Sequence, residues 1–148
     1  MKPLLRLVLA FAAAAVLAGC ASGPKFTEMK SSIPTLAADQ GRVMFYRTTA
    51  LGAAVQPEVR LNGVVVGSAV PNGFFWADRP PGPIEISTST EVERKLTFTL
   101  DKGQVRFVRL NISIGFFVGR IIPELVDNAT GEKEIADLSH APLKPAAK

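Results

Sequence analysis

The feature that most constrains the fold is a series of short stretches in which apolar and polar residues alternate, with turn-forming residues between them. The clearest is 108–114 (VRLNISI), where alternation places the apolar side chains on one face of a strand and the polar ones on the other. Such stretches recur at spacings of about ten residues, and no helical period accompanies them. We therefore expect an all-β fold, an antiparallel β-sandwich of about seven or eight short strands, with a closed barrel as the alternative.

The strongest local signal in the chain is Asn62-Gly63, which lies between two β-forming runs, 58–61 and 64–66. This dipeptide predicts a type I′ hairpin, because both central positions of that turn need a positive φ. In the expected register Val59 opposes Val66, and both lie on one face of the hairpin.

An apolar run precedes this domain and ends at Leu17-Ala18-Gly19-Cys20, where Cys20 is the only cysteine. The apolar segment 7–18 is too short for a transmembrane helix, which needs about 20 residues. With Lys2 and Arg6 before it, the segment has the form of a secretory signal peptide. The last four residues resemble the lipobox of bacterial lipoproteins. The alternative is an ordinary secretory signal that happens to end near a cysteine.

The lipobox resemblance implies cleavage before Cys20 and acylation of its thiol, with palmitate among the chains. A lone cysteine in an exported chain cannot form an internal disulfide, so acylation would account for it. Each buried methylene contributes roughly 0.8 kcal/mol, so two or three acyl chains anchor firmly. Ala21 stands where an aspartate would retain a lipoprotein at the inner membrane. The resemblance therefore implies a bacterial cell-envelope protein on the inner (periplasmic) leaflet of the outer membrane.

These patterns divide the chain into four parts. The stretch after the cysteine mixes Gly-Pro, Ser-Ser and Ile-Pro with scattered charges, which predicts a flexible tether of about 25 Å reach. The last residues are rich in proline, alanine and lysine and are expected to fray. The expected parts are the signal peptide (1–19), the lipidated cysteine and tether (20–40), the β-sandwich domain (41–136) and the frayed tail (137–148).

Composition and spacing argue against several function classes. The net charge of +4 includes two basic residues of the signal, so it gives no support to nucleic-acid binding. His140 is the only histidine and has no ligand cluster around it in sequence, so we expect no metal, no cofactor and no catalytic triad. The carboxylate pairs Glu91/Glu93 and Glu132/Glu134 are interpreted as solvated loops or edges rather than a glycosidase pair. We therefore do not expect an enzyme.

Four residues form a possible ligand or partner surface, namely Tyr46, Arg60, Phe74 and Trp76. Aromatic rings can stack on sugars, and arginines on a shared face can meet anionic groups. The alternative is core packing for the aromatic residues and a solvated sheet face for the arginine.

The order of these motifs resembles a known family. The opening strand Gly41–Arg47 (GRVMFYR) is followed by the Asn-Gly turn, the aromatic strand 74–76 and the Pro81-Gly82 loop. This order is similar to that of small bacterial lipoproteins grouped as domain of unknown function 2846. The run 59–86 also resembles the PEGA domain, a small surface β-domain. The resemblance implies a fold and a location, not a reaction.

The function expected from the sequence is therefore that of a lipid-anchored cell-envelope protein, structural or accessory, that acts by non-enzymatic surface contact. Its expected partners are the membrane, through lipid at Cys20, and an envelope protein that pairs with an exposed strand edge. The alternative is a carbohydrate- or peptidoglycan-binding module that uses the aromatic residues 74–76 and nearby arginines.

Overall fold

The computed structural model describes residues 20–90, 93–114 and 119–143. None of the helices within these ranges has the length and hydropathy needed to span a bilayer. The elements in chain order are α2 (Phe26–Met29), η1 (Lys30–Ser32), β1 (Gly41–Arg47), β2 (Glu58–Leu61), β3 (Val64–Ser68), β4 (Gly73–Arg79), β5 (Gly82–Ser89), β6 (Glu93–Leu100), β7 (Val105–Ile114), β8 (Gly119–Val126), α3 (Asn128–Ile135) and β9 (Ser139–His140).

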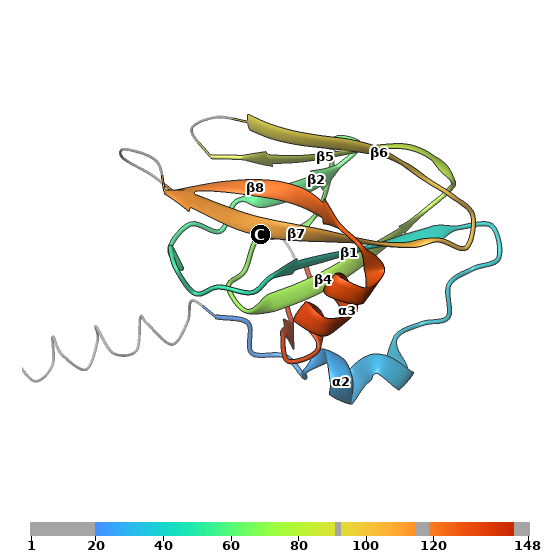
Figure 1. The fold of residues 1–148 in the computed structure, drawn as a ribbon, viewed down its shortest axis with the longest axis horizontal. Coiled ribbons are helices and arrows are strands. Elements are labelled where there is room, and N and C mark those ends of the chain that lie inside the picture. The colour runs from blue at the N-terminus through green and yellow to red at the C-terminus, as the bar shows by residue number, and fades with distance from the viewer. Residues whose placement is uncertain (1–19, 91–92, 115–118, 144–148) are drawn as a thin grey trace, which may run out of the picture.

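The strands form two packed sheets, so the predicted β-sandwich is confirmed in its coarse form (Figure 1). Sheet A has the order β8-β7-β1-β4-β9, and sheet B has the order β3-β2-β5-β6. Sheet B is antiparallel, as predicted, but sheet A is mixed, because β1 pairs with β7 in parallel and β4 pairs with β9 in parallel. The chain leaves sheet A for sheet B twice between β1 and β7, and β7 then enters in the direction of β1.

The Asn62-Gly63 hairpin forms as predicted between β2 and β3, and φ is 49° at Asn62 and 80° at Gly63. Its register differs at one position, because a β-bulge makes Val59 pair with Gly67 instead of Val66. The bulge places Gly67 against the ring of Phe75 in the core. The contact is so close that a Cβ on residue 67 would stand 2.5 Å from Phe75 Cε2.

The main core lies between the two sheets and is built from apolar residues of both. Phe45 and Phe75 stack in it with ring centroids 4.9 Å apart. Burial of each such ring contributes about 2 kcal/mol. The fully buried members, with no exposed surface, are Val43, Phe45, Val59, Leu61, Ala69, Ile86, Leu100 and Val108.

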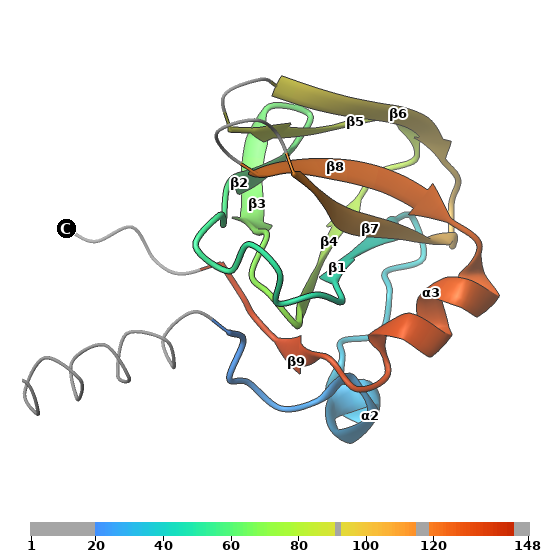
Figure 2. The same ribbon diagram turned by 60° about the vertical axis from the view of Figure 1, so that its left-hand side comes forward.

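A second core covers the outer face of sheet A, which explains why every residue of β1 is buried. The side chains of β1 that point away from sheet B, Met44 and Tyr46, belong to this core. Figure 2 shows α2, α3 and β9 on this side of sheet A. The buried members of the second core are Phe26, Met44, Tyr46, Phe74, Phe107, Ile135 and Leu138.

The helix α3 departs from the predicted all-β fold. Asp127 caps it by accepting a hydrogen bond from the Thr130 amide at 3.0 Å. Gly131 lies directly on the ring of Phe107, where a Cβ would collide. The helix therefore depends on its cap and on packing against β7 more than on amphipathic periodicity.

Segments within the predicted tether (20–40) and frayed tail (137–148) make ordered contacts with the domain, and residues 144–148 lie outside the described residues. Residues 21–33 lie on the domain, with the Phe26 amide bonded to the Leu138 carbonyl at 2.9 Å. The His140 amide donates to the Pro24 carbonyl at 2.8 Å, and Ser139–His140 forms β9 beside β4. The two segments satisfy several of each other's backbone groups, so each helps to order the other.

Candidate functional site

Cys20, the predicted lipidation site, is exposed and forms no disulfide. The next residue is already fixed to the domain, because the Ala21 amide donates to the Pro71 carbonyl at 3.1 Å. Gly23 then passes so close to the His140 carbonyl that a Cβ would collide with it. The cysteine therefore stands at the surface of the folded body itself.

The four residues of the predicted partner surface do not form one exposed face. Tyr46 and Phe74 have no exposed surface and belong to the second core. Trp76 is half-buried on the same face of sheet A. Arg60 is exposed on β2 of sheet B, where it pairs with Glu58 at 2.5 Å. The arrangement agrees with core packing for Tyr46 and Phe74.

Trp76 lies between two cationic or titratable side chains on the outer face of sheet A. His140 stacks on it with ring centroids 4.9 Å apart, and the Arg42 guanidinium lies 5.8 Å from its ring. Burial lowers the pKa of His140, so its neutral form is favoured. Arg42 also forms a bidentate pair with Asp78, at 2.6 and 2.7 Å. The proline-, alanine- and lysine-rich composition of the tail gave no indication that His140 packs on an aromatic ring.

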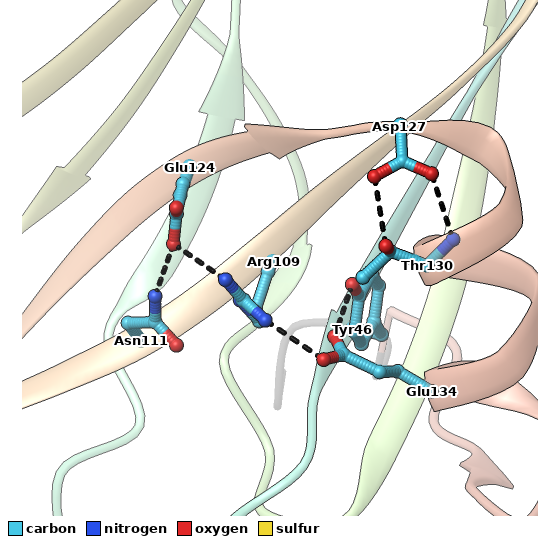
Figure 3. A network of polar contacts seen from close by, with 7 residues as sticks. All are labelled: Tyr46, Arg109, Asn111, Glu124, Asp127, Thr130 and Glu134. Atoms are coloured by element: carbon cyan, nitrogen blue, oxygen red, sulfur yellow. Dashed lines mark hydrogen bonds and ion pairs between the residues drawn. The ribbon is translucent and has the colours of Figure 1, made fainter.

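A polar network ties α3 to sheet A (Figure 3). The Tyr46 hydroxyl donates to Glu134 Oε2 at 2.7 Å, and Arg109 Nη1 contacts Glu134 Oε1 at 2.8 Å. Arg109 also contacts Glu124 at 3.0 Å, and Asn111 donates to the same carboxylate at 2.5 Å. Burial, and then the bond to Glu134, raise the pKa of Tyr46 far above its ordinary value. The phenol therefore remains a hydrogen-bond donor, and the network serves to hold the helix.

Arg47, at the end of β1, is fully buried. Its guanidinium donates to the carbonyl oxygens of Val55, Ala69, Leu51 and Gly52, at 2.7, 2.9, 2.5 and 3.1 Å. Its Nε has no hydrogen-bond partner among the described residues. Burial lowers the pKa of this group below its ordinary value. The arginine joins the loop after β1 to the loop before β4.

A cavity of about 310 Å³ lies between the segment 26–36, α3 and the first half of β1. Its walls are mostly apolar, with Met44 and Phe107 on the sheet, and Lys30 and Glu132 also line it. The described residues contain no group of three or more His, Cys, Asp or Glu side chains placed to hold a metal ion.

Of the two carboxylate pairs noted in the sequence, Glu132/Glu134 lies within the described residues. Glu91 lies outside the described residues. Glu132 and Glu134 both belong to α3 instead of a strand. Glu132 lines the cavity, whereas Glu134 is bonded to Tyr46 and Arg109. The carboxylates of Glu132 and Glu134 therefore have different neighbours.

These features define a mixed, sandwich-like β domain whose sheet A is covered by segments from both ends of the described chain. The chain belongs to the family described as "Protein of unknown function (DUF2846)", whose model matches residues 37–120. The family expected from the motif order is thus confirmed.

A curated relative from Haemophilus influenzae, described as "Uncharacterized protein", is 29% identical over 97 residues. The match covers 65% of this chain and 58% of the relative, so the chain spans less than two thirds of that protein's length. No solved structure matches. The family match contains β1 to β7 and excludes α2, α3 and β9. The cover of sheet A thus lies outside the matched region.

Proposed function

We propose that this protein is a lipid-anchored component of the bacterial cell envelope, on the periplasmic leaflet of the outer membrane, and that it acts by surface contact instead of catalysis. The observation that carries the proposal is the sequence Leu17-Ala18-Gly19-Cys20 at the end of an apolar run. The exposure of Cys20 supports it, because a modifying enzyme needs access to the thiol.

The surroundings of the titratable side chains support a non-catalytic role. Arg42 and Arg109 are each engaged by carboxylates, and Tyr46 is held as a donor by a raised pKa. His140 is stacked on Trp76 and has a lowered pKa, without a nearby acid or nucleophile in hydrogen-bond contact among the described side chains. These groups each have a structural partner, which favours a role in shape over a role in chemistry.

The outer face of sheet B is the surface best suited to an envelope partner. It is polar and exposed, with ion pairs between Arg60 and Glu58 and between Lys95 and Glu85. Its edge strands β3 and β6 have one neighbour each, so either could accept a strand from another protein. The peptidoglycan-binding alternative has less support, because Tyr46 and Phe74 would not be available to stack on a sugar.

Metabolic labelling with radioactive palmitate tests the anchor. The wild-type chain and a Ser22→Ala control should incorporate label and fractionate with the outer membrane. Cys20→Ser should incorporate none and should leave the membrane fraction after high-salt washing. Equal labelling of all three chains, or no labelling of any, would contradict the proposal.

A further inference from the structure

One end of the molecule, which contains Cys20, includes four segments without a charged residue, and Arg120 lies beside them, next to Gly119. Its four segments are 20–24 (CASGP), 48–57 (TTALGAAVQP), 69–73 (AVPNG) and 141–143 (APL). We call this the anchor end. In both views the start of the described chain and the loop after β1 lie on the same side (Figure 1 and Figure 2).

Contacts between these segments show that they form one surface. The Ala21 amide bonds to the Pro71 carbonyl, and a Cβ on Gly73 would stand 3.0 Å from the Ala21 Cβ and 3.2 Å from that of Ala141. Beneath them, Arg47 donates to carbonyl oxygens of both loops. Its charge is therefore enclosed and does not reach the surface.

Two leucines protrude from the anchor end. Leu51 is 56% exposed and Leu143 is 50% exposed. An exposed leucine alone needs no explanation, but two on neighbouring uncharged segments offer apolar contacts at the same end of the molecule. The opposite end, which we call the distal end, carries exposed Asp39, Asp101 and Lys102. The two ends are separated by the length of β1, about 20 Å.

The segment that follows Cys20 is held against the domain by its backbone. Ala21, Pro24 and Phe26 each have a backbone hydrogen bond to the domain, and Lys25 forms a bridge with Ser139. A flexible tether would let the domain tumble at a distance from the lipid, whereas this segment fixes it one residue from the attachment point.

We propose that the anchor end rests against the lipid bilayer, with Leu51 and Leu143 in the interfacial region and the distal end facing away. The inference rests on the proposed acylation of Cys20 and adds a fixed orientation to it. Acyl chains and apolar side chains then enter the same membrane surface together, so the leucines reinforce the anchor. The distal end and the outer face of sheet B are left free for other partners.

Depth-dependent fluorescence quenching tests this orientation. The full chain, processed in cells, is purified and reconstituted in vesicles of phosphatidylethanolamine and phosphatidylglycerol. Leu51→Cys supplies one free thiol, because Cys20 is acylated, and it is labelled with an environment-sensitive fluorophore. Val64→Cys is the matched control, since Val64 is equally apolar and 59% exposed but lies in the β2–β3 hairpin. That hairpin belongs to the distal end, because Asn62 bonds to Pro83 and Glu85.

Lipids brominated near the headgroup should quench the label at residue 51 several-fold more than the label at residue 64. Leu143→Cys should behave like Leu51→Cys. Equal and weak quenching at the two ends would overturn the inference if the same sample incorporates palmitate. Absence of palmitate from that sample would instead overturn the proposed function, and the orientation with it.

Discussion

The two ends of β1 each bury an arginine, and they satisfy it in different ways. Arg42 forms a bidentate ion pair with Asp78, on an end of the molecule that also exposes other charges. Arg47 is surrounded by four backbone carbonyl oxygens and forms no ion pair among the described residues. Carbonyl oxygens add no net charge to their surroundings. The second arrangement can therefore order two loops without a charged partner for the arginine.

The largest expected effect is that of removing the guanidinium at the anchor end. Arg47→Met should reduce the free energy of unfolding by about 4 kcal/mol, because four carbonyl oxygens lose their donor in a buried site. Urea unfolding of the soluble chain carrying Cys20→Ser measures it. Arg60→Met, on the exposed side of sheet B, is the control and should cost less than about 1 kcal/mol. Similar losses for both variants would contradict the structural importance of the carbonyl shell.

A smaller loss is expected at the charged end. Asp78→Asn keeps the shape but removes the charge that faces Arg42, and should cost about 2 kcal/mol. The loss is smaller than at Arg47 because the Asp78 side chain is 26% exposed and water can reach the site. The same urea titration measures it, ideally at low and high salt. A larger loss of unfolding free energy for Asp78→Asn than for Arg47→Met would contradict the expected ranking of the two ends.

A third variant tests the contribution of the docked segment after Cys20 independently of the two arginines. Gly23→Val would push its side chain into the His140 carbonyl, so the segment after Cys20 should leave its place. We expect a loss of about 1–2 kcal/mol, since the hydrogen bonds of Ala21 and Pro24 are exchanged for water. Hydrogen exchange should show lower protection at the Ala21 and His140 amides, with the Arg42 end unchanged. Ser22→Val is the control, and full protection in Gly23→Val would contradict the docking.

The smallest expected effect is a dependence on pH. Burial lowers the pKa of folded His140 below the ordinary value of about 6.5, so the folded state binds this proton less readily than the unfolded state. This contribution to stability is complete above pH of about 6.5 and is lost as pH falls through the lowered folded-state pKa. His140→Phe should flatten that part of the stability–pH curve. An unchanged slope in His140→Phe would assign the dependence to another group.

The fold could be predicted where local chemistry decides the structure. Asn62-Gly63 specifies its own turn, and strict alternation along 108–114 predicts a strand with one apolar face. The direction of that strand could not be predicted, since the parallel pairing of β7 with β1 depends on where the chain returns. The helix α3 was missed because packing of Gly131 on Phe107 stabilises it, and that contact is distant in sequence.

The features of the candidate site also differ in how far local sequence could predict them. The motif that ends at Cys20 is local, so the sequence alone was sufficient to propose it. The docking of the following residues was not visible, because their partners lie at 71 and 136–140. The shell of Arg47 had no signal either, since every residue has a carbonyl oxygen and only the folded loops bring four of them together.

Mass spectrometry of the N-terminal peptide from the protein purified out of intact envelopes tests the account most directly. We predict a mature chain that begins at Cys20, with a mass increased by a thioether-linked diacylglycerol and an acyl group on its amine. A chain that retains residues 1–19, or one that begins near Cys20 with a free thiol that reacts with maleimide, would contradict both the anchor and the orientation built on it.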